Sequence, residues 1–126
     1  MLFQPLLKGE QNLKAIEVAH MAVEIATDKQ AIDIVLLDVR GIATFADFFI
    51  VCSGQSNRQI NAIYDEILYS LKKKGVLPRH REGTTDSGWL LIDYGDVIIH
   101  IFAPNERTYY KLDELWSQAS PMVVIQ

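Results

Sequence analysis

The sequence predicts an α/β (α+β) fold in a single domain, with a five-stranded mixed sheet and helices packed against it. Short apolar runs of four to six residues, which suit buried strands, alternate with longer stretches of helical periodicity. The chain has 126 residues, which is close to the commonest domain size, and it contains no repeat, low-complexity tract or linker. We therefore expect one hydrophobic core.

The first elements are a helix and two strands. A helix is expected over residues 13–27, where four apolar residues recur at helical spacing: Ile16, Ala19, Val23 and Ala26. The runs Ile34–Leu37 and Phe48–Cys52 then predict buried strands. Residues 38–47 are too few for a helical crossover, so these strands are expected to be antiparallel or joined by an irregular loop.

A second helix is predicted to begin at Ser56, because Gln59 follows at the spacing of a capping box. Its apolar face then follows helical spacing: Ile60, Ile63, Tyr64, Ile67 and Leu71. The run Lys72–Lys74 favours the negative end of the helix dipole and Gly75 suits a left-handed cap, so the lysines have a structural explanation. A short strand near Leu77–His80 is expected to complete a β-helix-β unit with parallel strands.

Residues 89–93 and 97–102 predict a hairpin about a two-residue turn at Tyr94-Gly95. In that register Asp93 faces Asp96, and Trp89 faces His100. One face is then aliphatic and is expected to be core: Leu90, Ile92, Val97, Ile99 and Ile101. The other, which we call the mixed face, carries Trp89, Leu91, Asp93, Asp96, Ile98, His100 and Phe102.

The mixed face has two interpretations. A Trp beside carboxylates on a partly apolar surface has the composition of a binding interface, and a basic partner would relieve the repulsion between facing aspartates. On this interpretation Trp89, Leu91 and His100 belong to the working surface. Alternatively, Trp89 and Phe102 form a second small core under a carboxyl-terminal helix expected at residues 105–116, and the aspartates cap the turn.

Charge is unevenly distributed along the chain, whose formal net charge is −4. Residues 1–81 hold ten Lys/Arg and nine Asp/Glu, whereas residues 82–114 hold seven acids and two bases. This acidic third suits a basic protein surface and argues against direct DNA binding. No run of 18 apolar residues and no signal-peptide pattern is present, and a lone Cys52 gives no support for secretion. We expect a cytoplasmic protein without a membrane association.

Several motifs at consistent spacing resemble the ribosomal silencing factor (RsfS, Iojap-like) family. They are Asp47–Gly54, Ser56–Gln59, Glu82-Gly83, Gly88–Phe102 and Tyr109–Trp116. The resemblance covers roughly residues 14–116. We therefore expect a family domain at 13–116, an N-terminal extension at 1–12 and a loose C-terminal tail at 117–126.

The resemblance implies a nucleotidyltransferase-like fold that has lost its chemistry and acts as a translation repressor. Such a protein binds the large ribosomal subunit through large-subunit ribosomal protein fourteen and sterically blocks joining with the small subunit. It also implies a homodimer when the protein is free. Carried onto this sequence, the resemblance implies partner contacts at six residues: Trp89, Asp93, Gly95, Asp96, Arg107 and Tyr110.

The strongest alternative is a nucleotide-binding or nucleotidyl-transferring enzyme of the same fold. Gly54-Gln55-Ser56 precedes a helix whose amides could hold a phosphate, but no Asp-x-Asp pair follows Ser56 to position a divalent metal. The three histidines, at 20, 80 and 100, lack metal-ligand spacing. Cys52 lies in an apolar strand and is expected to be an inert core residue. We therefore expect no catalytic residue, metal or cofactor.

Overall fold

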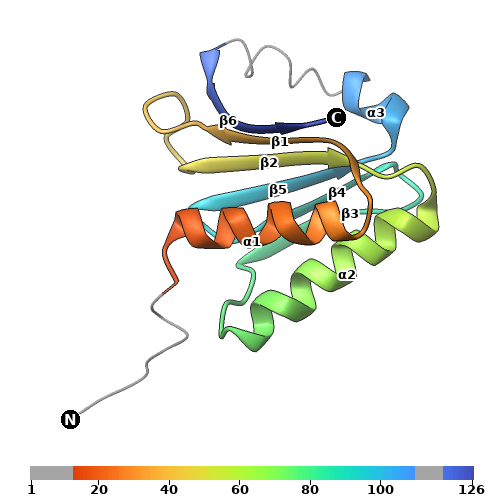
Figure 1. Ribbon diagram of the computed structural model, residues 1–126, viewed down its shortest axis with the longest axis horizontal. Coiled ribbons are helices and arrows are strands. Elements are labelled where there is room, and N and C mark those ends of the chain that lie inside the picture. Colours follow the sequence, from red (N-terminus) through yellow and green to blue (C-terminus); the bar gives the residue numbers. More distant parts are fainter. Residues whose placement is uncertain (1–12, 110–117) are drawn as a thin grey trace.

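The computed structural model describes residues 13–109 and 118–126. A mixed sheet forms one layer, and two long helices form a second layer on one of its faces (Figure 1). The helices are α1 (Ala15–Asp28), α2 (Asn57–Lys73) and the short α3 (Pro104–Tyr109). The strands are β1 (Ile32–Asp38), β2 (Phe48–Ser53), β3 (His80–Thr84), β4 (Trp89–Asp93), β5 (Val97–Phe102) and β6 (Ser120–Ile125).

The strands lie in the order β3-β4-β5-β2-β1-β6. The central neighbours β2 and β5 are parallel, and the other described neighbours pair antiparallel. The predicted mixed α/β sheet is therefore confirmed, as is the antiparallel arrangement of the first two strands. β2 and β5 are buried at every residue, which explains why both read as unbroken apolar runs.

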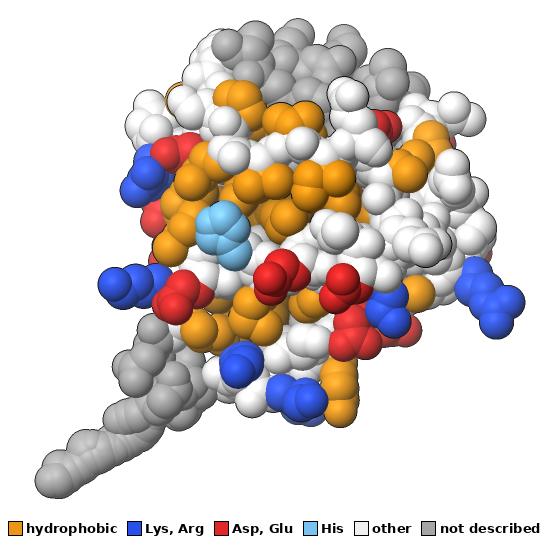
Figure 2. Space-filling view, viewed as in Figure 1, with side chains coloured by type: hydrophobic (Ala, Val, Ile, Leu, Met, Phe, Trp, Pro, Cys, Tyr) orange, Lys and Arg blue, Asp and Glu red, His pale blue; other side chains and the backbone are white. Residues whose placement is uncertain are grey.

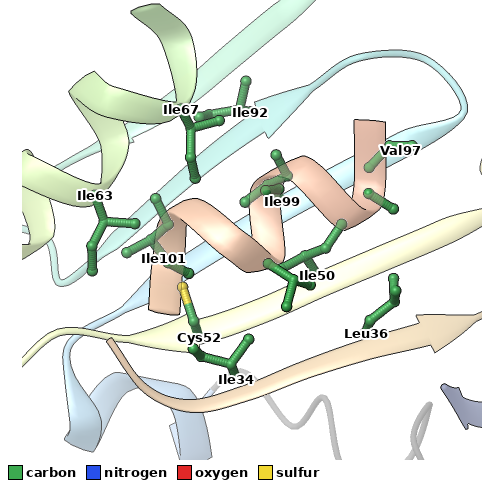
Figure 3. Packing of buried hydrophobic residues seen from close by; sticks show 14 of the residues in the cluster. Ile34, Leu36, Ile50, Cys52, Ile63, Ile67, Ile92, Val97, Ile99 and Ile101 are labelled. Carbon is green, nitrogen blue, oxygen red and sulfur yellow. The ribbon is translucent and has the colours of Figure 1, made fainter. Parts of the chain in front are cut away.

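The main core lies between the helix layer and the sheet. β1, β2 and β5 contribute aliphatic side chains from one face, and α1 and α2 contribute their apolar stripes. Figure 3 shows Ile50, Ile99 and Ile67 among the side chains that meet there. Cys52 is fully buried in the same cluster, as the apolar run predicts.

The strand count predicted from the sequence is wrong, because the described residues form six strands. The sixth, β6, lies in the segment expected to be a loose tail and pairs antiparallel with β1, with Ile125 opposite Ile34. β1 is distant in the sequence, so no local pattern reveals the pairing. The N-terminal extension expected at residues 1–12 lies outside the described residues, and its domain boundary stays a prediction.

β3 also differs from its prediction. It runs from His80 to Thr84 instead of ending near His80, and Leu77 is exposed in the preceding loop. Every residue of β3 is exposed, because it is an edge strand, so it has no apolar periodicity to detect. β3 does run in the same direction as β2, but β4 and β5 lie between them.

The β4–β5 hairpin is shifted by two residues from the predicted register. Trp89 lies opposite Phe102 and Asp93 lies opposite Ile98, so the turn is centred on Gly95-Asp96, one residue later than predicted. A turn centred on Tyr94-Gly95 would have required a positive φ at Tyr94, whereas here Gly95 has φ +92° and the Tyr94 N–H donates to the Val97 carbonyl. A shift of two preserves the faces, so the predicted aliphatic core face is confirmed.

Candidate functional site

The mixed face of the hairpin lies on the side of the sheet away from α1 and α2, which we call the opposite face. A second, smaller core covers part of it and contains five buried residues: Leu37, Val39, Ala46, Phe49 and Ile98. Leu91 packs at its edge and is half-buried. The mixed face is thus partly covered by a core, but this core does not contain Trp89 or Phe102 as the second interpretation expects, and much of the helix expected at residues 105–116 lies outside the described residues.

Four aromatic rings occupy the centre of the opposite face, and we call them the aromatic cluster: Phe49, Trp89, His100 and Phe102. The rings of Trp89, His100 and Phe102 lie within 9° of parallel, with centroids 6.0–6.1 Å apart. Phe49 tilts against His100 at 5.2 Å. Strand alternation and the observed register bring these side chains to one face, because Trp89 opposes Phe102, and Phe49 and His100 come from the adjacent parallel strands.

His100 is buried inside this cluster, with 7% of its surface exposed. Its Nδ1 accepts a hydrogen bond from the indole N–H of Trp89, at 3.2 Å, so the proton of the neutral ring lies on Nε2. Burial lowers the pKa of His100 to about 4, because the charged form loses its hydration. The ring is therefore neutral near pH 7 and supports Trp89 instead of presenting a charge.

The Trp89 indole is only half-buried, although both neighbouring rings are buried. Its hydrogen bond to His100 and its stacking on Phe102 hold the indole in one orientation. A large aromatic side chain that is already ordered loses little conformational entropy when a partner binds. This arrangement suits an interface anchor.

The two aspartates of the hairpin do not face each other, so the predicted charge repulsion is wrong. The Asp93 carboxylate accepts the Gly95 N–H at 2.7 Å and caps the turn. Asp96 is exposed, and its backbone carbonyl accepts the N–H groups of Asp47 and Phe48 at 2.8 and 3.0 Å. These bonds fasten the β4–β5 turn to the β1–β2 loop and place Asp47, Asp93 and Asp96 at one end of the sheet.

The remaining predicted contact residues occupy different positions. Gly95 is buried, and a side chain there would meet Arg79 at 3.2 Å, so its role is to shape the turn. Arg107 lies in α3, directly after β5. Tyr110 lies outside the described residues. The structure thus gathers Trp89, Leu91 and His100 on the opposite face and the aspartates at its end.

Sequence reasoning missed two aromatic residues of this region. Phe49 was predicted only as part of a buried strand, yet it lies against His100. Phe45 lies in the irregular loop expected between the first two strands, yet 65% of its surface is exposed and its ring lies 5.9 Å from that of Phe49. The available signal was a single aromatic residue in the expected loop at residues 38–47.

Backbone N–H groups around the start of α2 already donate hydrogen bonds to the protein's own side chains. Ser56 Oγ accepts the Gln59 N–H at 3.1 Å, and the Gln59 side chain accepts the Gln55 N–H at 2.7 Å. The Gln59 amide also donates to the carbonyls of Lys29 and Gln30 at the end of α1. The Gln59 N–H in α2 and the Gln55 N–H before it therefore have partners. The predicted reciprocal capping box is only half formed, because the Gln59 side chain accepts the Gln55 N–H instead of the Ser56 N–H and joins the two helices.

Neither a metal centre nor a membrane span is evident in the described part of the chain. Among residues 13–109 and 118–126, no three His, Cys, Asp or Glu side chains are grouped as metal ligands. Over the same ranges, no helix is long and apolar enough to cross a bilayer.

Comparison with known proteins gives one consistent result. A family model described as "Ribosomal silencing factor during starvation" matches residues 12–126. The ribosomal silencing factor of Halalkalibacterium halodurans is 40% identical over 103 residues, which cover 82% of this chain and 88% of that protein. The chloroplastic Iojap protein of Zea mays is 30% identical over 118 residues, covering 94% of this chain and 51% of that protein.

Solved structures agree with the sequence comparison. A crystal structure of a Chromobacterium violaceum protein superposes with a TM-score of 0.78 at 33% identity, and the match covers 88% of this chain and 94% of that chain. A crystal structure from Bacillus halodurans superposes with a TM-score of 0.72 at 39% identity, covering 80% and 94%.

Proposed function

This chain belongs to the ribosomal silencing factor family, and from that premise we propose that it is a ribosome-silencing translation repressor. The family is named for silencing, and the Iojap relatives share the same domain. We propose that the chain binds the large ribosomal subunit through large-subunit ribosomal protein fourteen. A folded domain at that position would obstruct joining with the small subunit, and the mechanism would be steric.

The observation that carries this proposal is a hairpin with the preordered Trp89 at the start of β4 and the exposed Asp96 in the turn at its other end. Trp is enriched among the residues that dominate binding energies, and its contribution is largest where neighbouring groups exclude water. The aromatic cluster supplies that setting, and Asp96 adds negative charge at its end. A basic ribosomal protein is the complementary partner, because opposite charges speed encounter and fix orientation.

The helix-covered side supports this choice of face by contrast. There, Asp and Glu side chains lie among Lys and Arg side chains, below a hydrophobic band (Figure 2). Because both signs are mixed on that side, it offers no uniform field to a basic partner. We therefore assign the partner contact to Trp89, Leu91 and Asp96, with His100, Asp93 and Gly95 holding them in place. Arg107 and Tyr110 complete the proposed contact set.

We propose that the chain has no catalytic activity. The nucleotide-binding alternative requires free amides at the start of α2 and in the loop before it, but Ser56 takes the Gln59 N–H and the Gln59 side chain takes the Gln55 N–H. It also requires clustered carboxylates for a divalent metal, and the described residues offer no such group. The nucleotidyltransferase-like ancestry of the fold stays a prediction. So do a cytoplasmic location and a homodimer in the free state.

Co-sedimentation tests the proposal. Wild-type protein is expected to pellet with isolated large subunits and not with small subunits. Asp96→Lys reverses an exposed charge without removing a turn hydrogen bond, since only the Asp96 backbone carbonyl is engaged. Asp96→Lys should weaken binding. Glu24→Lys makes the same charge change at an exposed position of α1 and should not weaken binding. Absence of wild-type binding, or equal loss in both variants, would contradict the proposal.

A further inference from the structure

The β1–β2 loop, from Val39 to Asp47, carries an aromatic side chain that belongs to neither hydrophobic core. Phe45 is 65% exposed, the largest value among the exposed large hydrophobic side chains of the described residues. Its neighbours behave differently, because Ala46 is buried and Ala43 packs on the second core. The loop is thus anchored on either side of a ring that points outward.

Hydrogen bonds hold this loop in one shape. The Val39 N–H donates to the Asp47 carbonyl at 2.9 Å and closes the loop at its base. The N–H groups of Ile42 and Ala43 both donate to the Val39 carbonyl, at 3.0 and 2.9 Å. At the entry, the Arg40 guanidinium binds the Asp38 carboxylate through two N–H groups, at 3.0 and 2.7 Å. Phe45 is therefore held by an ordered loop, which lowers the entropic cost of using it in an interface.

Ring contacts connect Phe45 to the aromatic cluster. Phe45 lies 5.9 Å from Phe49, and Phe49 lies 5.2 Å from His100, which stacks beside Trp89. The two accessible rings, Phe45 and Trp89, are thus the ends of a path whose middle members are buried. An interface that covered the opposite face would engage both ends.

The charges around Phe45 indicate the kind of partner. The backbone bond from Asp47 to Asp96 brings the Phe45 loop beside the acidic turn that also carries Asp93. The nearest base in the loop, Arg40, is paired with Asp38. By contrast Tyr69, which is 59% exposed on α2, has the Lys73 ammonium over its ring. The exposed Asp96 lies in the turn bonded to this loop, so a basic surface with a small apolar depression would complement both that carboxylate and the exposed Phe45 ring.

We propose that Phe45 is a second anchor for the partner of the opposite face, and that its ring enters an apolar seat flanked by Lys or Arg on a large-subunit ribosomal protein. This inference rests on the proposed function and adds the β1–β2 loop to its contact surface. Two aromatic anchors at opposite ends of the face fix the orientation of the domain, which one anchor cannot do.

The test measures the affinity of labelled protein for isolated large subunits. Phe45→Ala is expected to weaken binding about tenfold or more, as removal of a buried interface aromatic does. Its thermal melting should match that of the wild type, because the side chain is mostly exposed. Leu77→Ala is the matched control, since Leu77 is 63% exposed and lies in the α2–β3 loop. It should leave the affinity unchanged.

A crosslinking experiment covers the case in which Phe45→Ala disturbs the loop. A photo-reactive phenylalanine analogue at position 45 should crosslink to a large-subunit protein, and the same analogue at position 77 should not. If wild-type protein binds but Phe45→Ala binds equally well and position 45 gives no crosslink, the inference is wrong and the proposed function stands. If wild-type protein does not bind large subunits, both are wrong.

Discussion

The Trp89 indole N–H donates to Nδ1 of His100 at 3.2 Å, while the two rings lie within 8° of parallel. The pair combines features of the two interpretations of the mixed face, a small core and a binding surface. His100 is a core residue, and the half-buried Trp89 is held by that core in an orientation suited to contact. The structural role of His100 and the binding role that we propose for Trp89 can be separated by variants.

Trp89→Phe should separate the hydrogen bond from the ring. Phenylalanine keeps an aromatic ring above Phe102 but leaves His100 Nδ1 buried without its donor, which costs about 1–3 kcal/mol of unfolding free energy. Urea denaturation followed by circular dichroism measures this cost. Tyr69→Phe, which removes a polar group from an exposed ring, is the control and should change the stability little.

Stability should fall in mild acid because of His100. Its pKa is about 4 in the folded protein and about 6.5 when unfolded, so between these values the unfolded chain binds more protons. The unfolding free energy therefore rises with pH across this window. As pH falls from 6.5 toward 4, the unfolding free energy decreases by up to about 3 kcal/mol. Urea titrations at pH 7.5, 6.5, 5.5 and 4.5 measure the slope.

The control for this pH dependence is His100→Phe, which removes the titrating group and keeps a ring. Its stability should depend less on pH than that of the wild type over the same window. Identical slopes for the two proteins would show that carboxylates elsewhere cause the acid sensitivity.

Gly→Ala substitutions at two positions should distinguish the cost of backbone strain from the cost of a steric clash. Gly41 and Gly83 have φ of +85° and +88°, but a Cβ at Gly41 meets nothing within 4 Å, whereas one at Gly83 would lie 2.0 Å from the Trp89 carbonyl oxygen. Gly41→Ala should cost about 1–2 kcal/mol, the price of the left-handed conformation. Gly83→Ala should cost more and displace β3 from β4. Equal costs in chemical denaturation would argue against the close approach.

Gln59 should matter for stability beyond its role as a helix cap. Its side chain accepts the Gln55 N–H and donates to the carbonyls of Lys29 and Gln30, so Gln59→Ala breaks the link between α2 and the end of α1. Ser56→Ala removes only the bond to the Gln59 N–H and should cost about 1 kcal/mol. Thermal melts of both variants test this order, with Gln59→Ala the less stable.

Local sequence patterns were sufficient to predict much of the fold. Periodicity predicted α1, α2, β1 and β2, and alternation assigned every β4 and β5 residue to its face even though the register was wrong by two. Alternation depends only on parity, so an even shift leaves it intact. The position of the turn depends on Gly95, whose positive φ the pattern does not specify.

Contacts between residues far apart in the sequence could not be predicted from local patterns. Nothing local indicates that β6 joins β1, or that Asp47 bonds to Asp96 and brings Phe45 beside the hairpin. The candidate site was predicted from the hairpin with Arg107 and Tyr110, whereas the aromatic cluster and Phe45 come from the hairpin, β2 and the β1–β2 loop. Phe45 and Phe49 were missed for that reason.

We propose that the opposite face, through Trp89 and Asp96, keeps the large subunit from joining the small one. Light scattering during reassociation of purified subunits measures this directly. We predict that wild-type protein and Glu24→Lys both suppress the rise in scattering, and that Asp96→Lys and Trp89→Ala restore it. Suppression by Asp96→Lys and Trp89→Ala as complete as that by the wild type would contradict the account.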